Sequence, residues 1–111
     1  MTEFNYRVYN TIHKGGRARL LLRYKIVLPD RSIIAMKAWA VPRSPRMPEG
    51  VKYSLAYIDG SGRRALGYDN AEGKGHHRHE GEAETPVDFE SIDAHMALFL
   101  KELREIRGIV L

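Results

Sequence analysis

Three histidines lie within four residues in the segment GYDNAEGKGHHRHEGE, which runs from Gly67 to Glu82. The same sixteen residues hold two cations and four carboxylates. Imidazole has an unperturbed pKa of about 6.5, so it can give or take a proton near neutral pH. Lysine and arginine can stabilise the negative charge of a phosphate. This combination suits cleavage of RNA, in which a base activates a 2′-hydroxyl and an acid protonates the leaving oxygen.

Each residue type in this segment has a candidate role. We assign acid and base catalysis to His77 and His79, and we include Asp69 among the catalytic residues. Contacts to phosphate or nucleic acid are predicted for Lys74, Arg78, Tyr68, Asn70, Gly73, Gly75 and His76. Structural roles stay open for three of these residues: Tyr68 can anchor the core, and Asp69 and Asn70 can shape a turn through hydrogen bonds to the backbone.

Two other interpretations of the histidines stay open. With neighbouring carboxylates they can bind zinc or manganese, although His76 points away from His77 and His79 in an extended chain. At most two of the three can then share one ion without a turn. They can also form a solvated surface that pairs with nearby carboxylates. We therefore assign no metal ligands and expect no cofactor, with a divalent metal as the open alternative.

Residues 70–85 are predicted to be a long loop, because glycines interrupt them and they contribute little to a core. Loops beyond about 12–15 residues are usually functional or disordered. Apolar and polar residues alternate in the segments that should carry this loop, and these predicted strands are 4–12, 18–28, 31–41, 52–59 and 63–69. The proline-rich stretch 42–50 should be an exposed basic loop.

One helix is predicted, in SIDAHMALFLKELREIRG at 91–108, with Ser91 as its N-cap and Gly108 at its end. An apolar stripe at helical spacing consists of Ile92, Met96, Phe99, Leu100, Leu103 and Ile106. His95 lies off this stripe and is predicted to be a surface residue. The predicted fold is α+β, an antiparallel β-meander of about four to five strands with one C-terminal helix packed on the sheet.

Composition fits one domain over residues 1–111, with 43% apolar residues and no cysteine. No apolar run reaches the roughly 20 residues of a membrane span, so we expect a cytoplasmic protein without membrane contact. Charge is uneven, since residues 1–67 hold thirteen Lys and Arg against four Asp and Glu. This excess suits nucleic acid or an acidic protein partner, or it protects a soluble sheet against aggregation.

The run LGYDNAEGKGHHRHEGEAETPVDFESID, with LLLRYKIVLPDRS and YSLAYID before it, resembles the TumE family of toxins from prokaryotic toxin–antitoxin modules. The most specific part is YDNAEGKGHHRH, and the resemblance covers residues 18–105. It makes 18–107 the common core and 1–17 an N-terminal extension or edge strand. The resemblance implies a helix-turn-helix antitoxin as partner and a toxic activity directed at RNA rather than DNA.

The expected function is therefore that of a type II toxin acting on RNA as an endoribonuclease, with histidine acid–base chemistry and Lys and Arg phosphate contacts. One alternative is a module that binds nucleic acid or protein without catalysis. A further alternative is a metal-dependent nuclease or hydrolase that uses the histidine cluster. A homodimer is also expected if the strand at 4–12 or 52–59 has an exposed edge.

Overall fold

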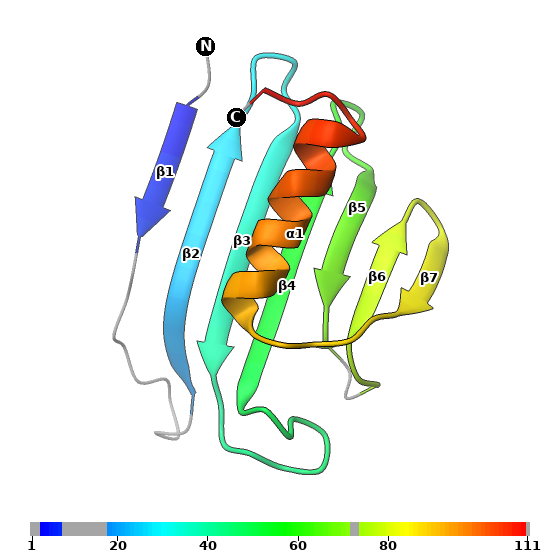
Figure 1. The fold of residues 1–111 in the computed structure, drawn as a ribbon. Helices are drawn as coiled ribbons and strands as arrows, with labels where there is room; N and C mark the ends of the chain where they lie inside the picture. The colour runs from blue at the N-terminus through cyan, green and yellow to red at the C-terminus, as the bar shows by residue number, and fades with distance from the viewer. Residues whose placement is uncertain (1–2, 8–17, 72–73, 111) are drawn as a thin grey trace.

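A computed structural model describes residues 3–7, 18–71 and 74–110 of the chain. These residues form one antiparallel sheet of seven strands, each paired with its sequence neighbour, and one helix lies across a face of the sheet (Figure 1). The elements are β1 (Glu3–Arg7), β2 (Arg19–Val27), β3 (Ile33–Ala40), β4 (Val51–Ile58), β5 (Arg64–Asp69), β6 (His77–Glu80), β7 (Ala83–Pro86) and α1 (Ile92–Glu105). The α+β class, the meander and the C-terminal helix are confirmed.

The strand number is larger than predicted because β6 and β7 form a hairpin over residues 77–86, and all but the last of these residues belong to the segment 70–85 that we predicted to be a loop. The prediction of a loop without secondary structure was wrong. β6 pairs with Leu66 to Asp69 of β5 on one side and with β7 on the other, so backbone hydrogen bonds hold its polar sequence in the sheet. Gly81, with φ of 58°, adopts the left-handed conformation that the tight turn between β6 and β7 requires. Pairing with β5, rather than apolar content, makes this segment a strand.

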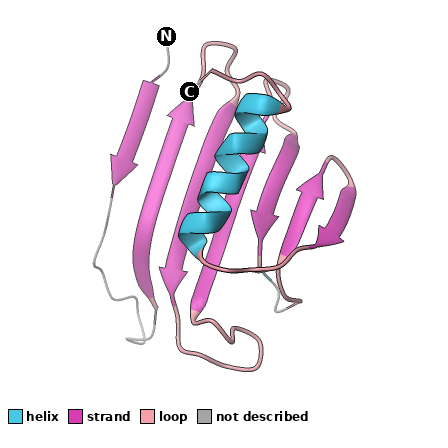
Figure 2. Ribbon diagram, in the orientation of Figure 1, coloured by secondary structure: helices cyan, strands magenta, loops and turns pink. Residues whose placement is uncertain are grey.

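The two faces of the sheet differ because side chains alternate along each strand. One face is apolar and packs against α1, where Phe99 and Leu103 of the helix are fully buried. Among the described residues, no helix lies on the opposite face (Figure 2), and we name this face the open face. By alternation and register, its residues include Arg23, Lys25, Ala35, Lys37, Trp39, Lys52, Ser54, Ala56, Gly67, Asp69, His77 and His79.

The helix begins and ends near the predicted residues. The Ser91 hydroxyl accepts a hydrogen bond from the Ala94 N–H at 3.0 Å, which confirms the N-cap. Gly108 has φ of 65° and lets the chain reverse after α1. Ile106 is 65% exposed and does not join the buried stripe, whereas His95 is only 3% exposed. The predictions for Ile106 and His95 were therefore wrong.

One of the two strands that we predicted to have an exposed edge for a homodimer does not lie at an edge of the sheet. β4, predicted as 52–59, lies in the middle of the sheet between β3 and β5, so it offers no free edge for a homodimer. The edges are β1 and β7. The predicted strand 4–12 corresponds to β1 in part, and residues 8–12 lie outside the described residues. Within the described part of the chain, no helix is both long and apolar enough to span a membrane.

Candidate functional site

His79 and Asp69 face each other on the open face, from the adjacent strands β6 and β5. Nε2 of His79 lies 3.1 Å from Oδ2 of Asp69, and the two side chains are only 14% and 17% exposed. A carboxylate is an acceptor only, so this contact favours the tautomer in which Nε2 carries the proton. Nδ1 of neutral His79 then keeps its lone pair and can accept a proton. The two predicted catalytic residues thus have the geometry of a general base and its orienting carboxylate.

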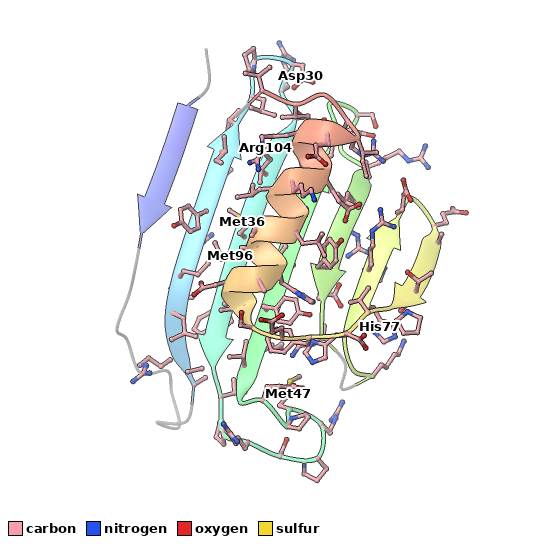
Figure 3. All side chains as sticks on the ribbon, viewed as in Figure 1. Asp30, Met36, Met47, His77, Met96 and Arg104 are labelled. Atoms are coloured by element: carbon pink, nitrogen blue, oxygen red, sulfur yellow. The ribbon has the colours of Figure 1, made fainter. Side chains whose placement is uncertain are left out.

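Figure 3 labels His77 beside the β6–β7 hairpin. His77 lies two residues before His79, on the same face of β6, and is opposite Asp69 in the register. Its Nδ1 donates to the carbonyl oxygen of Gly75 at 3.2 Å, and its Nε2 lies 3.9 Å from Oε2 of Glu84 on β7. Residues two apart on a strand are about 6.6 Å apart at Cα. This spacing allows His77 and His79 to contact two different oxygens of one phosphodiester.

Arg64 joins this group although we did not predict it. Its Nη1 lies 3.5 Å from Oδ2 of Asp69, and 42% of its side chain is exposed. Strict alternation would put Arg64 on the helix face with Leu66, but a register shift between Tyr57 and Ile58 sets Arg64 opposite Ile58. The bulge therefore turns a cation onto the open face beside Asp69.

Gly67 leaves the space that the Arg64 side chain occupies. A Cβ atom at position 67 would lie 3.1 Å from Cδ of Arg64 and 3.2 Å from the carbonyl oxygen of Leu55. The second neighbour is backbone and cannot move aside cheaply. Because Gly67 has no side chain, the Arg64 side chain can lie over this position and extend along β5 to Asp69.

Tyr68 and Arg78, which we predicted as nucleic-acid contacts, lie on the helix face and meet Glu102 of α1. The Tyr68 hydroxyl donates to Oε1 of Glu102, and Nη2 of Arg78 lies 2.5 Å from Oε2. Burial acts to raise the pKa of Glu102, but hydrogen bonds from Arg78 and Tyr68 outweigh it and lower this pKa. Burial, followed by Glu102, raises the pKa of Tyr68 to about 12, so its hydroxyl stays protonated. Both residues therefore attach α1 to the sheet.

Asn70 is also buried, at 3% exposure, directly after β5. Its Oδ1 accepts from the Tyr53 N–H at 3.0 Å, and its Nδ2 donates to the Val51 carbonyl oxygen at 2.7 Å. A second contact of Nδ2 reaches Sδ of Met47 at 3.6 Å. Asn70 thus completes the hydrogen bonds of β4 beyond the last residue of β5.

Replacing Asn70 with alanine should lower the free energy of unfolding by about 1–3 kcal/mol, because the Tyr53 N–H and the Val51 carbonyl lose their partner where water enters poorly. Urea unfolding of the purified variant measures this. Asn70→Asp keeps the acceptor and loses the donor to Val51, so we expect it to be destabilised as well. An alanine variant as stable as the wild type would contradict the structural role.

His76 occupies a third environment, between the proline-rich loop and the helix face. Its ring stacks on Phe89 with centroids 4.3 Å apart. Its Nε2 contacts Oε1 of Glu49 at 3.0 Å, and its Nδ1 lies 2.8 Å from the Tyr53 hydroxyl. Nε2–H therefore donates to the carboxylate, and Nδ1 accepts from the hydroxyl. His76 connects the loop at 42–50 to the start of β6, on the side of the sheet opposite His77 and His79.

Comparison with protein-family models gives a match to toxin TumE over residues 5–107. The chain belongs to the TumE toxin family. The match begins before residue 18, where the resemblance was expected to start. No curated protein and no solved structure matches the chain. Membership of a toxin family implies an antitoxin as partner.

The remaining predicted site residues of this TumE toxin lie near the start of β6. Lys74 is exposed, and Gly75 has φ of 85°, a conformation that favours glycine. Gly73 lies outside the described residues. Among the residues the structure describes, no group of three or more His, Asp or Glu side chains could hold a metal ion. His76 is separated from the other two histidines by the sheet, as alternation predicted.

His95 of this TumE toxin is buried, although we predicted from the sequence that it lies on the surface. Rings of Tyr53, Tyr68 and Phe89 surround it at centroid distances of 5.4, 5.4 and 5.0 Å. Its Nε2 has no hydrogen-bond partner among the described residues. Burial, with a smaller effect from His76, lowers the pKa of His95 below its usual 6.5. His95 is therefore neutral in the folded protein at neutral pH.

Acidification should destabilise the fold through His95. The unfolded chain protonates this residue near pH 6.5, and the folded chain only at a lower pH, so the stabilisation is complete above about pH 6.5 and is lost as the pH falls toward the lowered pKa. Urea unfolding at about pH 7.5 and about pH 5.5 measures this loss. His95→Phe should lose less stability between the two pH values than the wild type. An equal loss in both proteins would contradict the prediction.

Proposed function

We propose that this TumE toxin belongs to a type II toxin–antitoxin module and cleaves RNA, with His79 as general base and His77 as general acid. The observation that carries the proposal is the 3.1 Å contact between Nε2 of His79 and Oδ2 of Asp69 on a basic, helix-free face. Asp69 holds the His79 ring with Nδ1 free of the proton. His77, on the same side of β6, supplies the second imidazole that the reaction needs.

The proposed reaction is an internal transfer at phosphorus. Nδ1 of His79 takes the proton from a ribose 2′-hydroxyl, and the 2′-oxygen attacks the adjacent phosphorus. The bond from phosphorus to the 5′-oxygen breaks, and protonated His77 gives its proton to that oxygen. The products are a 2′,3′-cyclic phosphate and a free 5′-hydroxyl. No water and no oxidant or reductant enters this step.

Arg64 is the cation that we propose for stabilising the developing charge on phosphorus. It lies beside Asp69 with an exposed guanidinium, and a guanidinium can donate two parallel hydrogen bonds to phosphate oxygens. Arg78 is engaged by Glu102 and Glu80 on the helix face. The phosphate role that the sequence suggested for Arg78 therefore passes to Arg64 in this proposal, with Lys74 as a second contact.

The antitoxin is proposed to be a helix-turn-helix protein that covers the open face. On this face β2 to β4 carry four cationic side chains, those of Arg23, Lys25, Lys37 and Lys52, and these strands hold no Asp or Glu, so an acidic surface complements them. Such a partner would mask the cations and the histidines together. This explains how one protein could neutralise the toxin without entering its core.

The test is to incubate the purified chain with RNA and to analyse the ends of the products. We expect 2′,3′-cyclic phosphate and 5′-hydroxyl ends, no effect of a chelator, and no cleavage of an oligonucleotide with 2′-deoxyribose at the cleaved position. Ends carrying a 5′-phosphate, with loss of activity in chelator, would overturn the proposal in favour of a metal-dependent nuclease. Binding without cleavage would overturn it in favour of a binding module.

A further inference from the structure

The open face, which also carries His77 and His79, holds a groove on strands β2 to β4. Its volume is about 260 Å³, and its lining includes Arg23, Lys25, Ala35, Lys37, Ser54 and Ala56 from β2, β3 and β4. Small-molecule sites usually measure about 300–1,000 Å³ and enclose their ligand. A smaller, partly open groove fits one segment of an extended chain lying across the strands.

The register continues this groove to the candidate active site. Lys37, Ser54, Asp69 and His77 are successive partners across β3, β4, β5 and β6. In the next row, Ala35, Ala56, Gly67 and His79 are successive partners across the same four strands. Neighbouring strands are about 4.8 Å apart, so Lys37 and His77 are about 14 Å apart. Cations therefore line one end of the path, and the histidines line the other.

Charge defines the ligand that suits this path. Arg23, Lys25 and Lys37 are exposed at one end, and β2 to β4 contribute no carboxylate to oppose them. Between the cations and Gly67 the side chains are short, because Ala35 and Ala56 form the floor of the groove. The Arg64 side chain lies over Gly67, so a further cation stands between this floor and the histidines. A backbone with one negative charge per unit can lie over this floor and contact the cations on one side.

We propose that this groove binds single-stranded RNA and delivers one of its phosphates to His77 and His79. This inference rests on the proposed function and adds the form of the substrate and its path. A partly open groove of this volume with a floor of alanines admits one backbone, whereas a duplex would touch only the long side chains at its rim. The 2′-oxygen must also line up with the leaving oxygen, which an unpaired backbone can do by rotation and an A-form duplex resists.

The test measures the binding of a fluorescent single-stranded 2′-O-methyl oligoribonucleotide, which has no free 2′-hydroxyl and cannot be cleaved by the proposed reaction. Two matched pairs of variants show whether the effect of a substitution on binding depends on its place in the groove or only on the change of charge. Lys37→Ala is compared with Lys101→Ala, an exposed lysine of α1, and Ala56→Glu is compared with Ala97→Glu, an exposed alanine of α1. Thermal unfolding checks that all four variants are folded.

We expect Lys37→Ala to weaken binding several-fold and to reduce the slope of log affinity against log salt by about 0.7, the value for one lost phosphate contact. Ala56→Glu should weaken binding at least tenfold, and the Lys101 and Ala97 variants should each bind markedly better than their open-face counterparts. A duplex of the same sequence should bind more weakly than the single strand. Equal affinities within each pair, a preference for the duplex, or no binding at all would overturn the inference.

These outcomes are independent of cleavage. If the chain binds the oligonucleotide through Lys37 and Ala56 but does not cleave RNA, the groove is supported as an RNA site and the proposed reaction is refuted. If all four variants cleave RNA equally well, the proposed reaction is supported and the groove is refuted as the path of the RNA. Binding of an acidic antitoxin to the same residues, with no binding of the oligonucleotide, would refute the groove as an RNA site.

Discussion

Replacing His79 with glutamine should lower the rate of RNA cleavage by about 10²–10⁴-fold, the usual contribution of a general base. Glutamine fills similar space and can donate to Asp69, but it cannot take a proton from a 2′-hydroxyl. Single-turnover cleavage of a labelled RNA measures the rate. In the proposed function RNA cleavage is the toxic step, so expression of the same variant in cells should no longer arrest growth although the fold is kept.

The matched control is His76→Gln, three residues earlier and on the opposite side of the sheet. Because His76 contacts Glu49 and Tyr53 rather than the open face, its loss should reduce thermal stability and leave cleavage within a few-fold of the wild type. A His79→Gln protein that is folded and cleaves RNA at the wild-type rate would remove His79 from the mechanism. Equal loss in both variants would indicate a general effect of the histidine cluster on structure.

Replacing Phe99 with alanine should cost about 3–5 kcal/mol of the free energy of unfolding, because Phe99 is fully buried between α1 and the sheet. Its ring also meets the edge of Tyr68 at 6.2 Å between centroids. Small domains are stable by only about 5–15 kcal/mol in total, so this one change removes a large share. Urea or thermal unfolding measures the loss directly.

Leu98→Ala provides a control from the adjacent residue of the same helix. Leu98 is 44% exposed, so its truncation removes little buried surface and should cost well below half of the Phe99 value. A Phe99→Ala protein that loses no more stability than the Leu98→Ala protein would mean that α1 does not pack on the sheet through this face.

The sequence was sufficient to predict the central strands, the basic proline-rich loop and the capped helix. These elements follow from local rules, such as alternation along β2 to β5 and a serine that bonds the first turn of α1. Local rules also put His77 and His79 on one face of the chain. They did not reveal β6 and β7, since a strand with the sequence HRHE depends on its partner β5 rather than on its own composition.

Which residues make up the candidate site depends on contacts between residues that are far apart in the sequence. Arg64 reaches Asp69 only because of a bulge beside Ile58, and no pattern in residues 63–69 signals that shift. Arg78 meets Glu102 across 24 positions of sequence, so its engagement could not be read locally. His95 was predicted to be exposed because it lies off the apolar stripe of α1. Its surroundings are instead four aromatic rings, including that of His76.

The alternation along β6 also bears on which natural changes this chain can tolerate. A shift of the strand by one residue would exchange its two faces, bringing His76 and Arg78 out and burying His77 and His79 against the helix. Point substitutions affect one side chain, but an insertion or deletion that displaces β6 would disrupt both the proposed catalytic pair of His77 and His79 and the contact between Arg78 and Glu102. Among related toxins, the length of chain between Asp69 and His77 should therefore vary less than its sequence does.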